Sequence, residues 1–145
     1  MNSQPGRVMM EENILELLDT GISKHYMDDS LSFIWCNPAF YKMLGYEKKD
    51  FLCKYPDLRQ YYGGEPDVFE GLRACFREAY GRGETSAVYQ ASMTDCNREN
   101  VWVELKGTIV KPPEGGLPVL YILYSDIRKW VVQQNEQSRD IQKRT

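Results

Sequence analysis

The chain has 145 residues, a formal net charge of −3, and 42% hydrophobic and 27% charged residues, the balance of one globular domain. Acidic and basic residues are mixed along it, so no basic field predicts nucleic-acid binding, and no apolar run approaches the roughly 20 residues that span a bilayer. The four cysteines are scattered and there is one histidine, which gives no metal-ligand pattern and indicates reduced thiols in the cytoplasm.

The first part of the chain predicts a helix followed by a hairpin. Residues 10–18 (MEENILELL) place aliphatic side chains on one face and acids near the start, which is typical of a short amphipathic helix. Residues 22–27 and 31–36 have the composition of strands, and the polar turn cluster at residues 28–30 (DDS) joins them. We therefore expect two antiparallel strands.

Short helices are predicted next. Asn37 is a good N-cap and Pro38 a good first helical residue, so a helix is expected to begin there and to end at Gly45. Further along we expect a short helix over residues 47–54, irregular chain over 55–66, and a longer amphipathic helix over 67–80 that Asp67 caps.

In the last part of the chain, apolar and polar residues alternate with a period of two. Strands are expected over residues 85–93, 100–110 and 117–127, separated by segments rich in Asp, Asn, Pro and Gly. The last of them is apolar at both alternating sets of positions, which predicts a central place in the sheet. Residues 128–145 follow a polar helical pattern with a weak heptad stripe.

This order of elements predicts an α+β fold with one antiparallel sheet and helices on one of its faces. We expect an N-terminal flanking helix within residues 1–20, the folded domain over 21–127, and a C-terminal exit helix over 128–145. Because the helical pattern runs to Thr145, we also expect the chain to be a piece of a longer protein.

Residues 33–46 (FIWCNPAFYKMLGY) resemble the PAS family, in which a strand is followed by Asn and by an aromatic-containing helix that ends in Leu-Gly-Tyr. Residues 101–104 (VWVE) resemble the family's Trp-containing fourth strand. Residues 125–128 (SDIR) resemble its Asp-Ile-Thr ending, with Arg in place of Thr. The resemblance implies a five-stranded antiparallel sheet in the order 2-1-5-4-3, with a cavity between the sheet and the helices.

The same resemblance implies a role in signalling. PAS modules sense small molecules, redox state or light, or simply dimerise, and their flanking helices couple them to output domains. We therefore expect a cytoplasmic, bacterial-type sensor that is not itself an enzyme and that forms a homodimer. Its expected partner in cis is an effector of the histidine kinase or diguanylate cyclase/phosphodiesterase type, as in two-component systems, which the sequence itself does not contain.

Aromatic and apolar side chains are the candidates for lining the implied cavity around a small-molecule ligand. They are Phe33, Trp35, Phe40, Met43, Phe69, Leu72, Phe76, Tyr89, Gln90, Tyr121 and Leu123. The plainer interpretation is that these side chains fill the core, since aromatic stripes are usually packing. In that case the domain would be a protein-interaction scaffold without a ligand.

The sequence does not identify a cofactor. Haem-binding members of the family place a histidine on the longer helix, whereas His25 lies on a strand, where we interpret it as a polar residue on an exposed face. Photoactive flavin domains of the LOV kind need a cysteine that residues 55–62 lack. A small thiol enzyme using Cys36 with His25 remains as a further alternative, since such a nucleophile needs a neighbouring base.

Four residues are candidates for passing the signal on. Asp126 stands at the junction between the last strand and the exit helix. Trp102 is expected to point outward from the sheet, where tryptophan is enriched at interfaces. Trp130 and Ile141 lie on the heptad stripe and are expected to pack between two exit helices.

Overall fold

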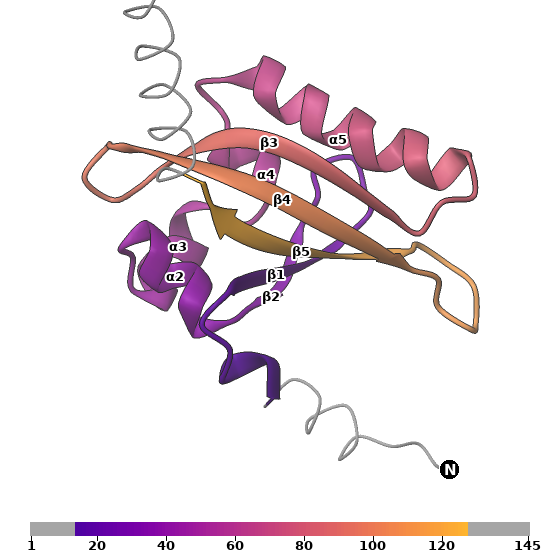
Figure 1. The fold of residues 1–145 in the computed structure, drawn as a ribbon, viewed down its shortest axis with the longest axis horizontal. Helices are drawn as coiled ribbons and strands as arrows, with labels where there is room; N and C mark the ends of the chain where they lie inside the picture. The colour runs from indigo at the N-terminus through magenta and orange to yellow at the C-terminus, as the bar shows by residue number, and fades with distance from the viewer. Residues whose placement is uncertain (1–13, 128–145) are drawn as a thin grey trace, which may run out of the picture.

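A five-stranded antiparallel sheet in the order β2-β1-β5-β4-β3 forms the centre of the computed structural model, which describes residues 14–127 (Figure 1). The strands are β1 (Gly21–Tyr26), β2 (Phe33–Cys36), β3 (Ser86–Thr94), β4 (Asn100–Val110) and β5 (Val119–Asp126). The predicted sheet order and the central place of the last strand are confirmed. The predicted exit helix lies outside the described residues, and of the N-terminal helix only one turn, at residues 14–16, lies within them.

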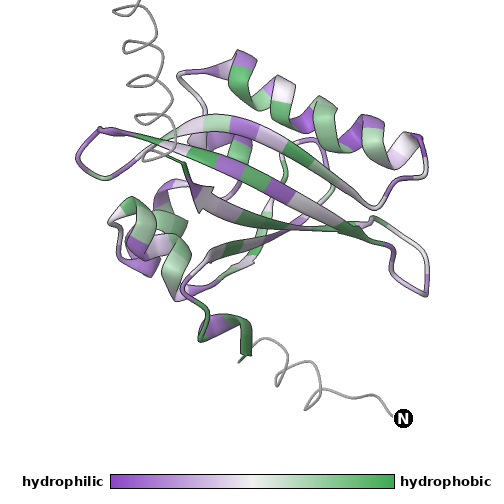
Figure 2. Cartoon of the chain, in the orientation of Figure 1, coloured by the Kyte–Doolittle hydropathy of each residue, from purple (hydrophilic) through white to green (hydrophobic). Residues whose placement is uncertain are grey.

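Side chains alternate across the sheet and so define its two faces. Along β4, Val101, Val103, Leu105 and Ile109 are buried against the helices, whereas the side chains between them are exposed or half-buried. Figure 2 shows the corresponding alternation of polar and apolar colours on β3 and β4. The face of the sheet that points away from the helices, which we call the outer face, carries Val88, Trp102, Glu104, Lys106, Tyr121 and Leu123.

The helices cover the other, inner face of the sheet. They are α2 (Pro38–Leu44), α3 (Lys48–Lys54), α4 (Leu58–Tyr61) and α5 (Pro66–Gly81). Helix α5 runs beside β3, and α2 packs against β1 (Figure 1). Phenylalanine, leucine and tyrosine side chains from all four helices meet the buried side chains of the strands in one hydrophobic core.

Two helix predictions need correction. Residues 55–66 were expected to be irregular, yet they contain α4, whose Asp57 carboxylate accepts a hydrogen bond from the Gln60 amide at 2.7 Å. A helix of four residues is too short to show an apolar period. In α5 the proline at position 66 opens the helix after Glu65, so Asp67 lies in the first turn and is not the cap.

Asn37 caps α2 as predicted and also joins three segments. Its side-chain oxygen accepts from the amides of Phe40 at 3.1 Å and Ile22 at 2.8 Å. Its side-chain nitrogen donates to the carbonyls of Leu15 at 3.0 Å and Thr20 at 2.8 Å. One fully buried side chain therefore ties the N-terminal segment and β1 to the start of α2.

Candidate functional site

Aromatic side chains fill the space between the sheet and the helices. Phe40, Phe69 and Phe76 are at most 1% exposed, and Leu72 is fully buried beside them. The ring of Phe51 lies 5.3 Å from that of Phe40 in an edge-on arrangement, which is a favourable geometry for aromatic pairs. The predicted cavity candidates on the helices thus belong to one hydrophobic core.

The other candidates on the inner face contribute to the same packing. The ring of Phe33 lies 5.4 Å from that of Phe51, and Met43 is half-buried against the core. The hydroxyl of Tyr89 reaches α5, where a Cβ added to Gly71 would come within 2.3 Å of it. These positions agree with the plainer interpretation, in which the aromatic side chains form the core.

Four predicted cavity residues do not face the interior. Gln90, Tyr121 and Leu123 occupy outer-face positions, because their buried neighbours along β3 and β5 take the inner ones. Trp35 also points outward, and its indole N–H donates to Glu16 at 3.4 Å. The reason is a β-bulge: Lys24 pairs with Trp35 but His25 pairs with Phe33, so the two aromatic residues of β2 fall on opposite faces.

His25 is fully buried, which corrects the prediction of an exposed strand position. A carbonyl can only accept, so the Nδ1–H of His25 donates to the carbonyl of Leu31 at 3.0 Å. The Ser23 hydroxyl then donates to Nε2 at 2.7 Å, and the Tyr124 hydroxyl donates to Ser23 Oγ at 2.6 Å. Burial lowers the pKa of His25 to about 4, so the imidazole is neutral at neutral pH.

This chain of hydrogen bonds argues against the thiol-enzyme alternative. Both ring nitrogens of His25 are engaged, by Leu31 and by Ser23, and neither is directed at a thiol. Burial also raises the pKa of the Cys36 thiol to about 12, so the nucleophilic thiolate is scarce at neutral pH. The pair therefore lacks the activated thiol that the chemistry needs.

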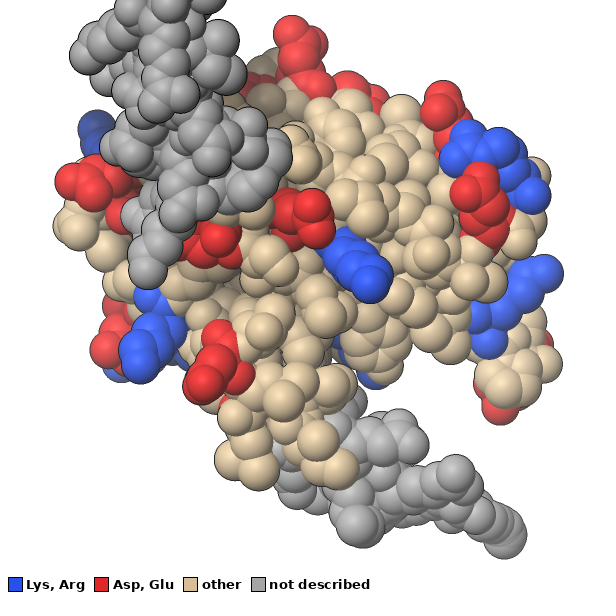
Figure 3. All heavy atoms as spheres, viewed as in Figure 1, with Lys and Arg blue, Asp and Glu red and all other residues tan. Residues whose placement is uncertain are grey.

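The outer face combines large apolar side chains with few charges. Val88 is 51% exposed, Trp102 47% and Leu123 36%. Figure 3 shows largely uncharged surface over the strands, with acidic and basic side chains both around it and within it. The Trp102 side chain thus points outward as predicted. Its backbone carbonyl accepts a hydrogen bond from the amide of Ile127 at 3.0 Å, at the end of β5.

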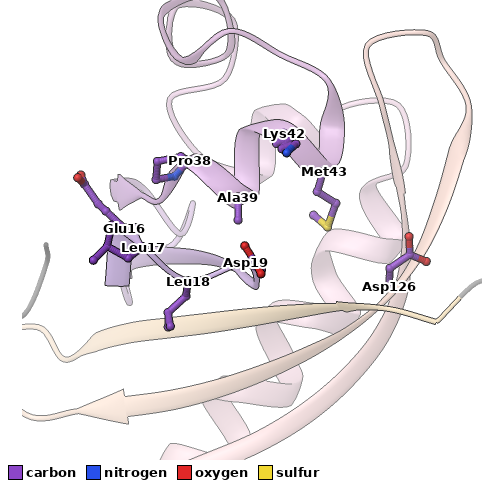
Figure 4. A pocket seen from close by; sticks show the side chains of 9 residues that line it. All are labelled: Glu16, Leu17, Leu18, Asp19, Pro38, Ala39, Lys42, Met43 and Asp126. Carbon is purple, nitrogen blue, oxygen red and sulfur yellow. The ribbon is translucent and has the colours of Figure 1, made fainter. Parts of the chain in front are cut away.

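Asp126 borders a pocket of about 610 Å³ between the N-terminal segment, α2 and the end of β5. The lining residues are Glu16, Leu17, Leu18, Asp19, Pro38, Ala39, Lys42, Met43 and Asp126. In Figure 4, Asp126 lies across this hollow from the N-terminal segment. The pocket therefore lies where the described chain both enters and leaves the sheet. Trp130 and Ile141 lie outside the described residues.

Comparison with known proteins settles the family. The sequence model of a protein family described as "PAS domain" matches residues 20–129 of the chain. The chain belongs to the PAS domain family. No curated protein matches the sequence significantly. Within residues 14–127 this PAS domain has no helix that is long and apolar enough to cross a membrane, and no group of three or more His, Cys, Asp or Glu placed to hold a metal ion.

Solved structures agree on the fold. An RNA-binding light-oxygen-voltage receptor has a TM-score of 0.71 at 15% identity, with 99% of this chain but 40% of the receptor covered. A PAS domain from a two-component sensor histidine kinase has a TM-score of 0.64 at 10% identity, covering 86% of this chain and 99% of that one. A domain of a sensory box sensor histidine kinase/response regulator from Geobacter sulfurreducens has a TM-score of 0.57 at 20% identity, covering 84% and 96%.

Proposed function

We propose that this PAS domain is a signal-transducing module that works as a homodimer, with the outer faces of two sheets in contact. The observation that carries the proposal is the exposure of Val88, Trp102 and Leu123 on that face. Large apolar side chains exposed on one face of a sheet are typical of interaction surfaces, and tryptophan is enriched in such surfaces. The filled interior supports a contact surface, rather than a ligand held between sheet and helices, as the input.

The charges on the outer face favour a second copy as the partner. Glu104 and Lys106 lie two residues apart on β4, on the same face, and neither has an ion pair with any residue of the described range 14–127. In a two-fold symmetric contact each surface meets its own copy. Glu104 of one chain would then face Lys106 of the other, which gives the contact a fixed register.

Coupling to an output follows from the position of Trp102. Its backbone carbonyl accepts a hydrogen bond from the amide of Ile127. A change in the packing of Trp102 on the outer face would therefore shift the position of Ile127, at the end of the last strand. Differential contacts equivalent to about 1–3 kcal/mol are enough for such coupling. The proposed effector is a histidine kinase or a diguanylate cyclase/phosphodiesterase in cis, in the cytoplasm, in line with the kinase-derived PAS domains that share this fold.

Sedimentation equilibrium of the 145-residue chain tests the proposal. We expect the wild-type chain to be a dimer and Trp102→Lys to be a monomer. Leu117→Lys is the matched control, because Leu117 is 53% exposed but lies in the loop between β4 and β5, and it should remain a dimer. A monomeric wild type at the highest attainable concentration, or a dimeric Trp102→Lys, would refute the proposal.

A further inference from the structure

The pocket beside Asp126 has an exposed apolar lining. Its apolar residues are Leu17, Leu18, Pro38, Ala39 and Met43. Leu17 is 83% exposed and Leu18 44%, and in Figure 4 the side chain of Met43 extends from α2 toward the hollow. Two adjacent leucines exposed beside a pocket are typical of a surface that another group covers.

The charged side chains of the same pocket are mostly acidic. Glu16, Asp19 and Asp126 contribute carboxylates, whereas Lys42 contributes the one ammonium group among the lining residues that the structure describes. Three negative charges against one positive charge leave the pocket with an excess of two negative charges. Because complementary charge selects a partner, the lining favours an occupant that has both apolar surface and positive charge.

The sequence that follows β5 has this combination. Residues 128–132 (RKWVV) carry two basic side chains followed by tryptophan and two valines, and the next acidic residue is Glu136. The other segment outside the described range, residues 1–13, has one basic residue against two acidic ones. Charge complementarity therefore favours residues 128–132 as the occupant of the pocket.

The distance along the chain also suits this occupant. Trp130 comes four residues after Asp126, which itself lines the pocket. Four residues span about 6 Å in a helix and about 13 Å in an extended chain. Since the segment starts at the pocket wall, either conformation leaves Trp130 within reach of the exposed leucines.

We propose that Trp130 docks into this pocket of its own chain. The indole ring packs against Leu18 and Met43, since a thioether makes favourable contacts with an aromatic ring. The two basic residues before Trp130 lie beside the carboxylates of the lining. A Trp130 held in this way is not free to pack between two exit helices, so docking and exit-helix pairing exclude each other. The proposal does not depend on the outer-face dimer.

Nuclear Overhauser effects (NOEs) measured by NMR on the full 145-residue chain test the contact. We expect NOEs between the ring protons of Trp130 and the methyl groups of Leu18 and Met43. A Trp130 ring without an NOE to any side chain that lines the pocket would overturn the proposal.

A mixture of isotope-labelled and unlabelled chains distinguishes the chain's own Trp130 from that of a second copy. We expect the NOEs within one labelled chain, and NOEs that arise only between a labelled and an unlabelled chain would overturn docking within the chain. The same NOEs should persist in Trp102→Lys, which is designed to be monomeric. Failure of the docking and failure of the outer-face dimer are therefore told apart.

A pair of charge reversals tests the role of the acidic lining. Asp19→Lys should speed amide hydrogen exchange at Val131 and Val132 severalfold, because the new charge repels the basic residues that precede Trp130. Glu114→Lys makes the same change in net charge at an exposed position of the loop between β4 and β5, outside the pocket, and should leave this exchange as in the wild type. Equal exchange rates in the two variants would contradict the proposal.

Discussion

Phe76 of α5 lies directly against the backbone of Gly107 in β4. A Cβ placed on Gly107 would come within 2.3 Å of one ring carbon of Phe76. The helix can approach the sheet this closely only because position 107 has no side chain. This contact closes the interior at the point where the family resemblance implied a cavity.

Gly107→Ala should destabilise the fold because the added methyl overlaps the Phe76 ring. Overpacking of a core by one carbon costs about 1–3 kcal/mol, which urea unfolding would measure. Gly81→Ala is the control: Gly81 ends α5, nothing lies within 4 Å of an added Cβ, and alanine favours helix, so stability should hold or rise. An unchanged free energy of unfolding in Gly107→Ala would mean that the interior has spare room.

Asn37→Ala should lower the free energy of unfolding by more than the loss of an ordinary helix cap does. The substitution removes four side-chain hydrogen bonds from a buried position and leaves the amide of Ile22 without its side-chain acceptor, whereas the Phe40 amide keeps the backbone carbonyl of residue 37. We expect a loss of about 3 kcal/mol in the free energy of unfolding.

Asp57→Ala is the matched comparison for Asn37→Ala, because Asp57 caps α4 through one exposed hydrogen bond. It should cost about 1 kcal/mol. Amide hydrogen exchange provides a second measurement, since Ile22 should lose protection only in the Asn37 variant. Equal losses of stability in the two variants would contradict the joining role of Asn37.

His25 should make the stability depend on pH. Its pKa falls from 6.5 in the unfolded chain to about 4 in the folded one, so the unfolded chain binds the extra proton between these values. Stability is therefore full above pH 6.5 and declines as the pH falls toward 4, by at most about 3 kcal/mol.

Unfolding of the wild type and of His25→Gln between pH 7 and pH 5 would measure this dependence. The variant has no titrating ring and should show a flatter profile. The window stays above the range of Asp28, whose pKa is lowered by hydrogen bonds to Ser32 and which adds its own loss of stability at more acidic pH. Parallel profiles for the two proteins would mean that the imidazole is not held neutral by the fold.

The sheet could be predicted from the sequence because β4 alternates cleanly and turn residues separate the last three strands. The sequence does not show which side chains of β5 point toward the helices, because Leu120, Ile122 and Tyr124 alternate with the similarly apolar Tyr121 and Leu123. Which set turns inward is decided by pairing with β1 and β4, a tertiary effect that one strand's sequence does not carry.

The buried polar residues were not predictable from the sequence for a related reason. Ser23 and Leu31 supply the hydrogen bonds of the buried His25, and Ser23 is bonded in turn by Tyr124, which is 101 residues away from it in sequence. The bulge that sends Trp35 outward leaves no mark in the sequence of β2.

A charge exchange on the outer face tests the proposed dimer most directly. In sedimentation equilibrium, Glu104→Lys and Lys106→Glu should each shift the 145-residue chain to monomer, because each places like charges opposite one another across the two-fold axis. The double variant carrying both changes should regain the dimer, since the two charges simply trade places. Dimerisation that is unaffected by the single changes, or a double variant that stays monomeric, would contradict contact between the outer faces of two copies.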